Sequence, residues 1–422
     1  MGHSYAENIQ HRTNTRTEIM GFIAPEPPSQ PNARRQRMTR RGIVVILIVA
    51  LLAIAAGFAW QHREYPLALI RGQIHPLGGS TQTTTLHLPT GFTAEVYASG
   101  LSAPRFLTFG LDGVLYVAES ANGRVTALPV DSATGKAARH VTVASDLQHP
   151  TSLAFAGNVL YVGETSRVTR MTIGADMQAS NEQRIITDLP SGGNHITRTV
   201  LFGADGKLYV SIGSSCNVCD ETDPHRASVW VYNPDGSSGH RYAYGLRNAV
   251  GMAVNPVTHA IWVTNMGRDL LGDNIPPDTI YALRAGANYG WPTCHAGNII
   301  DPDMGKPGDC DGVEQPLLRI QAHSAPLGLA FYSASAFPAS HRGLFVAYHG
   351  SWNRSVATGY KVVYIPLDGQ GHIAGPPKDF ATGWLHDGST SGRPVGLAVG
   401  PDGALYLSDD TAGLIYRIAY SG

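Results

Sequence analysis

The sequence is poor in charge, in cysteine and in long apolar runs, and each shortage excludes a class of protein. Only 15% of its 422 residues are charged and 43% are hydrophobic, a balance too apolar for a disordered chain. One apolar run alone, Ile43 to Ala59, approaches the length of a membrane span, which excludes a polytopic membrane protein. The 48 glycines and 27 prolines, spread over the whole length, argue against long helical bundles.

Positive charge is concentrated at the N-terminus. Residues 1 to 41 hold seven Arg and three Glu, a net charge of +4, so the rest of the chain carries -5 of the total of -1. A weakly acidic body argues against a nucleic acid as partner. Positive charge before an apolar run marks the cytoplasmic side of a membrane. Five arginines stand there: Arg34, Arg35, Arg37, Arg40 and Arg41.

This pattern predicts a membrane topology. Residues 1–41 are expected to form a cytoplasmic tail, 42–60 one transmembrane anchor, 61–85 a linker, and 86–422 an exported domain. The alternative is a signal peptide that is cleaved after export. Translation from Met38 would then leave two arginines before the apolar core, although Gly57-Phe58-Ala59 is only a loose cleavage signal.

The four cysteines all lie in the part expected to be exported, where disulfides persist. Cys294 and Cys310 enclose a stretch rich in Gly, Pro and Asp, which predicts a disulfide that closes a loop. The pair Cys216 and Cys219 leaves two interpretations, a local disulfide or half of a zinc site. Zinc is the less favoured, because the other two cysteines do not form a second C-x-x-C.

From residue 86 onward one pattern recurs six times: an apolar run ending in Phe or Val, a turn that often reads Asp-Gly, and an apolar pair around an aromatic residue. Short alternating strands joined at Asp-Gly turns are β-hairpins. The six copies are Phe106 to Val117, Ser152 to Val162, Thr199 to Val210, Gly251 to Val263, Gly328 to Val346 and Gly396 to Leu407.

The spacing of the copies predicts the fold. The first three aromatic positions, Tyr116, Tyr161 and Tyr209, are 45 and 48 residues apart, as in four-stranded propeller blades. The later spacings of 53, 83 and 61 residues imply loop insertions. We therefore expect an all-β, six-bladed β-propeller in residues 86–422, with Leu86 to Tyr97 supplying a strand that closes the ring. A β-sandwich would not explain six equivalent phrases.

Polar residues stand at equivalent positions before the first strand of the repeats. In a propeller, the innermost strand of each blade starts at one face beside the central axis, so such residues converge there. Four guanidinium groups, two imidazoles and two amides at one level are not expected of unrelated surface positions. They are Gln148, His195, Arg247, Asn248, Arg393, His323, Arg198 and Arg105.

This cluster combines guanidinium groups, which can bind a carboxylate or phosphate through two N–H groups at once, with an imidazole that can act as a base near neutral pH. A weaker signal for a hard cation follows the fourth hairpin. In the run from Asn265 to Asp269, Gly267 lets the backbone turn so that consecutive carbonyls could point at one ion. The nearby Asp269, Asp273 and Asp278 fit equally well as ligands of such an ion and as loop carboxylates that bind none.

Several of these segments together resemble the glucose/sorbosone dehydrogenase family over residues 86 to 420. That family consists of six-bladed quinoproteins that use pyrroloquinoline quinone (PQQ) and calcium. Two further segments, Cys216 to Cys219 and His349 to Arg354, are closer to its L-sorbosone dehydrogenase-like branch. The shared segments are Gly192 to His195 before Arg198, Tyr244 to Asn248, Gly267 to Asp269, Ala287 to Pro292 and Gly392 to Pro394.

The resemblance implies roles for individual residues. His195 would be the general base, and the carbonyl oxygens of Gly267 and Arg268 would bind calcium. On the fifth blade the family's cofactor-binding Lys is replaced by the stretch Ser351 to Arg354. Gln148 is an approximate match to a Gln that contacts substrate. The residues implied or proposed to bind the cofactor are Arg247, Asn248, Arg393, Arg354 and Arg198.

The sequence therefore predicts a PQQ-dependent dehydrogenase, anchored in the inner membrane and facing the periplasm. It would oxidise an aldose or a related sugar aldehyde, with hydride passing to the quinone and electrons leaving to a membrane quinone or a cytochrome. Two alternatives remain on the same fold. A calcium-dependent lactonase would need several carboxylates on one metal, and a non-catalytic glycan-binding propeller would bind no cofactor.

Overall fold

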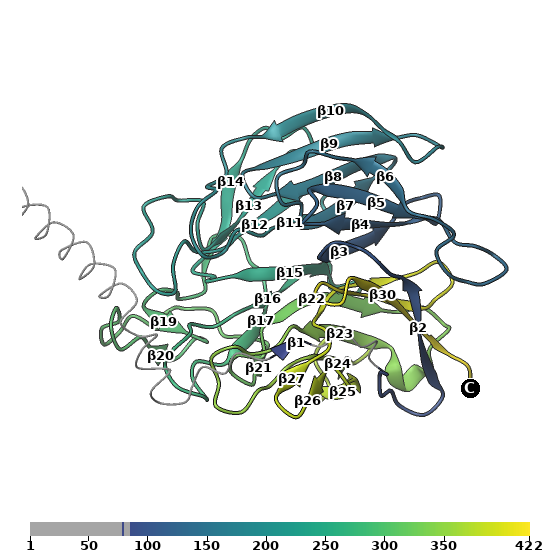
Figure 1. The fold of residues 1–422 in the computed structure, drawn as a ribbon. Coiled ribbons are helices and arrows are strands. Elements are labelled where there is room, and N and C mark those ends of the chain that lie inside the picture. The colour runs from purple at the N-terminus through teal and green to yellow at the C-terminus, as the bar shows by residue number, and fades with distance from the viewer. Residues whose placement is uncertain (1–77, 80–84) are drawn as a thin grey trace, which may run out of the picture. The chain divides into compact units, whose positions relative to one another are not determined.

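A computed structural model describes residues 78–79 and 85–422, and in them the chain folds as a six-bladed, all-β propeller (Figure 1). The six-bladed fold expected from the repeats is confirmed. The predicted tail 1–41, the span 42–60 and most of the linker 61–85 lie outside the described residues. No helix within the described part of the chain has the length and apolar character needed to cross a membrane.

Each blade is built on four antiparallel strands, which in blades 1 to 5 follow one another in sequence from the inside to the outside; in blade 6 the N-terminal β2 is the outer strand. Blade 1 consists of β3 (Pro104–Phe109), β4 (Leu115–Glu119), β5 (Arg124–Leu128) and β6 (Val141–Ala144). Blade 2 consists of β7 (Ser152–Ala156), β8 (Val159–Glu164), β9 (Arg167–Ile173) and β10 (Ala179–Ile186). Blade 3 consists of β11 (Arg198–Phe202), β12 (Leu208–Ile212), β13 (Ser228–Tyr232) and β14 (His240–Tyr244), with β18 (Ala287–Asn288) added at its edge.

The remaining blades follow the same plan. Blade 4 consists of β15 (Ala249–Val254), β16 (Ile261–Asn265), β17 (Asp278–Ala282) and β21 (Leu318–Ile320). Blade 5 consists of β22 (Pro326–Tyr332), β23 (Gly343–Tyr348), β24 (Lys361–Pro366) and β25 (Lys378–Ala381), with the 3-10 helix η1 (Ala339–His341) in its first turn. Blade 6 consists of β28 (Pro394–Val399), β29 (Leu405–Asp409), β30 (Leu414–Tyr420) and β2 (Phe92–Ala98).

Short strands outside the blades form two further ladders. One joins β19 (Cys294–His295) to β20 (Ile299–Ile300) within the insertion of blade 4. The other contains β1 (Gly78–Gly79), β26 (Leu385–His386) and β27 (Ser389–Thr390). The predicted linker therefore contributes one two-residue strand, β1, to the described structure.

The repeated Asp-Gly phrase forms a turn that is bonded to its own aromatic residue. In blade 1, Asp112 accepts the backbone N–H of Val114 at 3.0 Å and the hydroxyl of Tyr116 at 3.0 Å. The following Gly113 has φ of 73°, a left-handed conformation that favours glycine. The same set of bonds recurs at the turns of blades 3 and 6, which begin at Asp205 and Asp402. The phrase is thus a self-contained hairpin corner.

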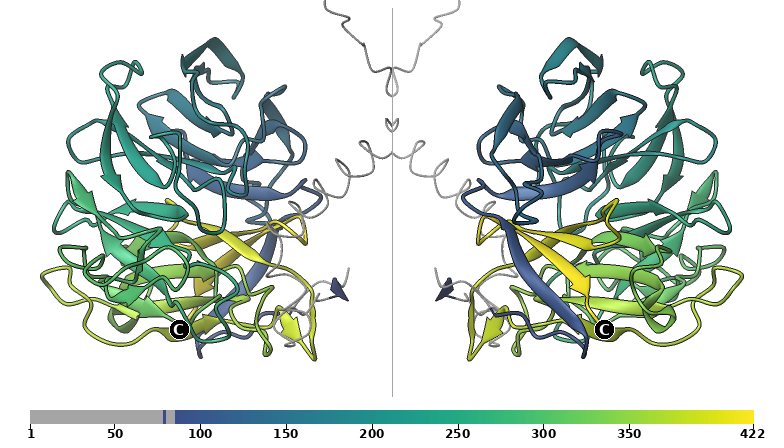
Figure 2. Two further views of the ribbon diagram at one scale, coloured as in Figure 1. Left: turned by 90° about the vertical axis from the view of Figure 1, so that its left-hand side faces the viewer. Right: turned by 90° about the vertical axis from the view of Figure 1, so that its right-hand side faces the viewer.

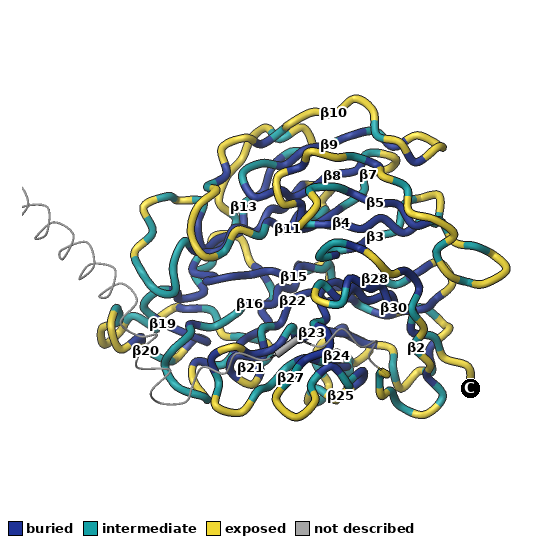
Figure 3. Tube along the Cα trace, viewed as in Figure 1, coloured by how far each residue is buried: buried dark blue, intermediate teal, exposed yellow. Residues whose placement is uncertain are grey.

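The hydrophobic core of the described residues is divided into seven clusters; six of them each lie between two neighbouring blades, and a small seventh joins Val250, Leu327 and Val395 of the first strands of blades 4, 5 and 6. Tyr116 and Val125 of blade 1, for example, pack with Leu160 and Met171 of blade 2. The other clusters between neighbours join blades 2–3, 3–4, 4–5, 5–6 and 6–1. Because every neighbouring pair shares a core, the sheets form a closed ring. Figure 3 shows the inner strands buried, whereas the outer β10 is largely exposed.

The N-terminal strand closes this ring. β2 pairs antiparallel with the C-terminal β30, from Phe92 opposite Tyr420 to Ala98 opposite Ile415. Figure 2 shows the dark blue β2 beside the yellow β30. This confirms the prediction of a closing strand near residues 86 to 97. Pairing the two ends of the domain gives the last blade its fourth strand and ties the start of the propeller to its end.

Strand direction determines where the loops gather. Within an antiparallel blade, the chain enters the first strand at one face and reaches that face again between the second and third strands. One face of the propeller therefore carries two kinds of loop: the connections between blades, and the turns between the second and third strands of each blade. The residues predicted for catalysis and for binding of cofactor, substrate and metal all lie on these connections and turns or at their ends.

Candidate active site

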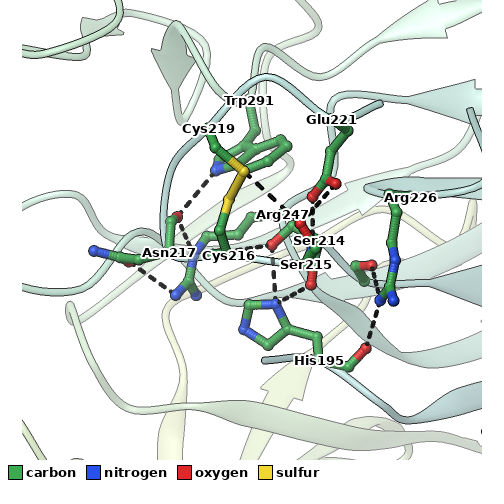
Figure 4. Close-up of a disulfide and its surroundings, with 11 residues drawn as sticks. His195, Ser214, Ser215, Cys216, Asn217, Cys219, Glu221, Arg226, Arg247 and Trp291 are labelled. Carbon is green, nitrogen blue, oxygen red and sulfur yellow. Dashed lines mark hydrogen bonds between the residues drawn. A yellow bond between two sulfur atoms is a disulfide. The ribbon is translucent and has the colours of Figure 1, made fainter. Parts of the chain in front are cut away.

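His195 lies in the connection from blade 2 to blade 3, next to the loop that follows β12 (Figure 4). Its Nδ1 is 2.9 Å from the carbonyl oxygen of Ser214 and 2.9 Å from that residue's hydroxyl. A carbonyl only accepts, so Nδ1 carries the hydrogen and the lone pair of the neutral ring is on Nε2. No described residue hydrogen-bonds Nε2. The imidazole is thus oriented as a base with its acceptor atom available.

The charges around this imidazole keep it neutral. Burial first, and then the positive charges of Arg247, Arg226 and Arg198, hold the pKa of the ring well below its usual value of 6.5, although the bond to the Ser214 carbonyl opposes the shift. The ring itself is half-buried. The ring is therefore unprotonated near neutral pH, which is the state that a general base requires.

Arg198 and Arg226 hold the His195 loop by its backbone. The Arg198 side chain is fully buried and donates to the carbonyls of His195 at 3.1 Å, Thr197 at 2.7 Å and Pro190. Arg226 donates to the His195 carbonyl at 3.3 Å and to that of Gly192. These contacts favour a supporting role for Arg198 rather than its predicted role as a cofactor ligand.

Arg247 is clamped between two loops. Its Nε donates to the Asn217 carbonyl at 2.9 Å, and its Nη2 donates to the Asn217 Oδ1 at 3.0 Å and to Asp269 Oδ2 at 2.8 Å. Its Nη1 donates to the Gly267 carbonyl at 2.7 Å. The neighbouring Asn248 is buried, and its backbone bonds to Asn265 and Met266. The fork of Arg247 therefore has one fixed orientation.

The turn from Gly267 to Asp269 lies against this clamp. The Gly267 N–H donates to the buried Asp278 at 2.8 Å, and burial raises the pKa of that carboxyl to about 7. The Arg268 side chain is buried and forms ion pairs with Asp301 at 2.5 Å and with Asp303 at 2.6 Å. The Gly267 carbonyl, predicted to bind calcium, is the acceptor for Arg247 here. One of its two lone pairs thus remains for a cation.

A second charged network crosses blades 5, 6 and 1 on the same face. His349 Nε2 is 3.0 Å from both carboxylate oxygens of Asp410, and Arg105 Nη1 is 2.6 Å from one of them. Although burial opposes ionisation, His349 and Arg105 hold the pKa of Asp410 well below its usual range. Arg393 donates to the carbonyls of His349 at 3.1 Å and Gly350 at 2.7 Å.

Three further predicted residues bond mainly to loops around these two networks. Arg354 donates to the Asp273 carbonyl and to Asn274 at 3.3 Å, which ties the fifth blade to the loop after β16. His323 Nε2 bonds the Gly272 carbonyl at 2.8 Å, and its Nδ1 is 3.8 Å from Asp269. Gln148 accepts the Ser166 hydroxyl and lines an open cavity of about 600 Å³ between blades 1 and 2.

Both cysteine pairs are disulfides, Cys294 to Cys310 and Cys216 to Cys219. The predicted loop-closing bridge is thus present. Of the two interpretations of the second pair, the structure has the local disulfide, whose sulfurs are not available as the thiolates that zinc requires.

Guanidinium groups on this face outnumber the carboxylates that form ion pairs with them; Glu221 and Asp223 act on Arg226, and Asp223 on Arg198, only at longer range. No described carboxylate forms an ion pair with Arg198, Arg226 or Arg393, whose guanidinium groups contact backbone carbonyls. Arg105 forms an ion pair with Asp410, and Arg247 forms one with Asp269. An excess of guanidinium groups around a neutral base fits a ligand with several carboxylates. The donor set of this face therefore agrees with the tricarboxylate that the sequence resemblance implies.

Gly213, the residue after β12, sets the distance between His195 and Asn248. A Cβ atom on it would lie 2.6 Å from the Cβ of His195 and 2.6 Å from the Oδ1 of Asn248. We expect Gly213→Ala to displace one of them and to lower kcat about tenfold or more. The matched control is Gly369→Ala, where nothing lies within 4 Å of the new Cβ. Equal activity of the two variants, with equal melting temperatures, would contradict this role.

Five site residues were not predicted from the sequence: Ser214, Asn217, Arg226, His349 and Asp410. Most of them lie in the turns after the second strand of a blade, which reach the same face as the connections between blades. His349 was part of a motif used for the family resemblance, and Asn217 lies between two cysteines. The positions before first strands converge on one face in every blade, whereas the turns after second strands differ in length and sequence, so the pattern predicts the former more readily than the latter.

A family model described as TrAA12-like matches residues 86–421. The chain belongs to this family. The chain is 30% identical over 356 residues to an uncharacterized protein of Borreliella burgdorferi, covering 80% of this chain and 92% of that protein. It is 27% identical over 411 residues to the pyrroloquinoline quinone-dependent pyranose dehydrogenase of Coprinopsis cinerea, covering 79% of this chain.

The alignment spans 54% of the length of the Coprinopsis dehydrogenase. The solved PQQ domain of pyranose dehydrogenase from Coprinopsis cinerea, in its holo form, superposes with a TM-score of 0.70 at 24% identity, covering 81% of this chain and 98% of the domain. This likeness shows the fold. The predicted membership in a family of PQQ-dependent sugar dehydrogenases is confirmed, while the sorbosone-like branch and the residue roles stay predictions.

Proposed function

We propose that this propeller is a PQQ-dependent dehydrogenase. It would oxidise an aldose or a related sugar aldehyde on the face that carries His195, Arg247 and Arg393. The observation that carries the proposal is the neutral His195, with Nε2 available, among guanidinium groups that exceed the carboxylates beside them. Family membership and the name of the Coprinopsis relative support the choice of a sugar as substrate.

In this proposal His195 accepts the proton of the substrate hydroxyl on Nε2. The Ser214 carbonyl holds the Nδ1 hydrogen and so keeps the ring in the required tautomer. Arg247, Asn248 and Arg393 would hold the carboxylates of the cofactor, and these would offset the charges that depress the pKa of the imidazole. The Gly267 and Arg268 carbonyls would hold calcium. When bound, PQQ supplies an ortho-quinone that takes up two electrons, and calcium a Lewis acid that polarises it.

The test is reconstitution of the apo-protein with PQQ and calcium, followed by a panel of sugars and an artificial electron acceptor. Turnover that requires PQQ and is lost after chelation of calcium is the expected result. Binding of PQQ without turnover of any sugar or sugar aldehyde would reject the substrate class. No binding of PQQ at all would reject the proposal.

A calcium-dependent hydrolase on this fold would need several side-chain oxygens directed at one ion. On this face, Asp269 and Asp410 are both engaged by arginines, and Asp278 accepts two backbone N–H groups. The arrangement therefore favours the oxidation of a sugar over the lactonase alternative.

The arginines give a direct test of the cofactor site. Arg393→Ala or Arg247→Ala should each weaken PQQ binding by at least about 1.5 kcal/mol, a tenfold loss, because a charge-assisted bond is removed. Lysine at either position should restore only part of the affinity, since it lacks the fork. Titration of the apo-protein with PQQ measures the effect.

The control for charge alone is Arg139→Ala. This exposed residue lies in the connection between β5 and β6, on the opposite face of the propeller. Its removal should leave the PQQ titration unchanged. If the Arg247 and Arg393 variants behave like this control, the cofactor binds elsewhere.

We further propose that the propeller works in the periplasm, tethered to the inner membrane by residues 42–60, and passes electrons to a quinone or a cytochrome. The charge pattern of the first 60 residues supports this placement. Protease added to spheroplasts should digest the propeller of the full-length protein. A protein deleted of residues 1–60 should still bind PQQ. Protection of the propeller from the protease would contradict the topology.

A further inference from the structure

One short loop contacts both the predicted base and the predicted cofactor arginine. It follows β12 and runs from Ser214 to Cys219 (Figure 4). At its start, the Ser214 carbonyl and hydroxyl are each 2.9 Å from Nδ1 of His195, and the same hydroxyl donates to the Cys216 carbonyl at 2.7 Å. The Ser214 N–H donates to the Arg247 carbonyl at 2.8 Å. The loop thus links two groups that act at different points of the site.

Asn217 uses both its backbone and its side chain on this site. Its carbonyl accepts Nε of Arg247 at 2.9 Å and the indole N–H of Trp291 at 3.3 Å. Its Oδ1 accepts Nη2 of Arg247 at 3.0 Å and the backbone N–H of Asp269 at 2.9 Å. Its Nδ2 donates to the Asp269 carbonyl at 3.1 Å. A single residue therefore fixes the guanidinium of Arg247 and the turn that carries Asp269.

These bonds determine which part of Arg247 a ligand can reach. The guanidinium has five N–H groups. The two acceptors on Asn217, together with Gly267 and Asp269, occupy four of them. One N–H on Nη1 is left, in a plane that Asn217 sets. Loss of the Asn217 side chain would remove one of these four bonds, together with that side chain's two bonds to the backbone of Asp269, so that the guanidinium could reorient.

The disulfide holds Asn217 in this orientation. Asn217 lies inside the four-residue ring that the Cys216–Cys219 bridge closes, and both cysteines are only half-buried. The carbonyl and the side chain of Asn217 must both face Arg247, which restricts its backbone. Closing the ring reduces the conformations that the loop can adopt and so favours this one.

We propose that Asn217, held by the Cys216–Cys219 bridge, is a positioning residue that fixes the Arg247 guanidinium for the carboxylate of the bound cofactor. The proposal rests on the proposed function for the identity of that ligand, but the positioning itself concerns the apo-protein. Arg247 is the charge that most depresses the pKa of the neighbouring imidazole, ahead of Arg226 and Arg198. A loosened Arg247 should therefore be detectable at His195 with no cofactor present.

The experiment compares Asn217→Ala and the double variant Cys216→Ala/Cys219→Ala with wild type. The first measurement follows the pKa of His195 by NMR of histidine-labelled apo-protein. We expect an upward shift in Asn217→Ala and a smaller one in the double variant. The second measurement is titration with PQQ, where Asn217→Ala should bind about tenfold more weakly, as expected for lost bonds to a charged group.

Val218→Ala is the matched control, because its side chain lies in the same ring and makes no hydrogen bond. It should change neither measurement. An unchanged His195 pKa in folded Asn217→Ala protein would overturn the inference, and melting curves show whether each variant is folded. If wild type binds no PQQ, the proposed function fails, and the pKa measurement still decides whether Asn217 positions Arg247.

Reduction of the wild-type bridge is an independent test of the disulfide's part. A small dithiol attacks one sulfur, the S–S bond breaks, two thiols form, and the dithiol leaves as a cyclic disulfide. The reduced protein should resemble the double variant in its His195 pKa. The double variant itself, treated with the same dithiol, should not change further. A reduced Cys216–Cys219 pair with a wild-type pKa at His195 would assign the positioning to Asn217 alone and overturn the role of the bridge.

Discussion

His195→Gln should lower kcat by about 100-fold or more and leave the affinity for PQQ close to that of the wild type. Glutamine can still donate to the Ser214 carbonyl, which now accepts the Nδ1 hydrogen at 2.9 Å, but it offers no basic lone pair. The loss should therefore fall on proton abstraction and not on the shape of the site. Steady-state kinetics of the reconstituted variant, with a PQQ titration of the same preparation, separates the two effects.

The control for this variant is His240→Gln, an exposed histidine in the outer strand β14 of the same blade. It should keep wild-type turnover. A His195→Gln enzyme that is fully loaded and turns over at the wild-type rate would show that another group is the base. His349 would then be examined first, because it lies on the same face and is oriented by Asp410.

The pH dependence of the same imidazole has a definite sign. Its pKa in the folded apo-protein lies well below 6.5, so it stays neutral at pH values where the unfolded chain already binds a proton. Folding stability is therefore reduced as the pH falls from about 6.5 towards the folded pKa. In wild type, the ring should titrate well below pH 6.5, and loading with PQQ should raise its pKa as carboxylates offset the arginines. A ring that titrates at its ordinary value would contradict the positive environment.

The fold could be predicted from the sequence because the blades repeat one hairpin turn, which is stabilised by contacts within a few residues. The Asp, Gly and Tyr of the hairpin phrase bond to one another, as Asp112, Gly113 and Tyr116 do, so the pattern is complete within a few residues. Closure of the ring could also be predicted, since a sixth blade with three strands requires a fourth. Both inferences depend on contacts that are local or repeated.

The site was only partly predictable, because the contacts that define it are neither local in the sequence nor repeated from blade to blade. His195 and Arg247 were found from their place before first strands, and the structure brings them together. The same rule selects Arg198, whose side chain donates to backbone carbonyls, and the family resemblance points to Arg354, which bonds a distant loop. Whether an arginine faces a ligand or a carbonyl depends on how irregular loops pack, and sequence patterns do not encode that packing.

The loop of Cys294 and Cys310 supports the site from outside. It carries Asp301, which is fully buried and bonded to Arg268 at 2.5 Å and to His295 at 2.7 Å. Although burial opposes ionisation, His295 and Arg268 hold the pKa of Asp301 well below its usual range. Its contribution to stability is therefore present above the unfolded carboxyl pKa and is lost only at lower pH. The loop thus holds the turn that was predicted to bind calcium.

Removing this bridge with Cys294→Ala/Cys310→Ala should lower the free energy of unfolding by about 3 kcal/mol, on the chain-entropy estimate for a loop of this size. Urea unfolding of the variant and of wild type, each with and without reductant, measures the loss. Cys216→Ala/Cys219→Ala is the control, because its four-residue ring constrains the unfolded chain less and predicts a smaller loss. Wild type should lose stability on reduction, whereas the Cys294→Ala/Cys310→Ala variant should lose only the smaller amount of the remaining bridge. Equal stability of that variant and of oxidised wild type would mean that the ion pairs of Arg268 hold the loop without the disulfide.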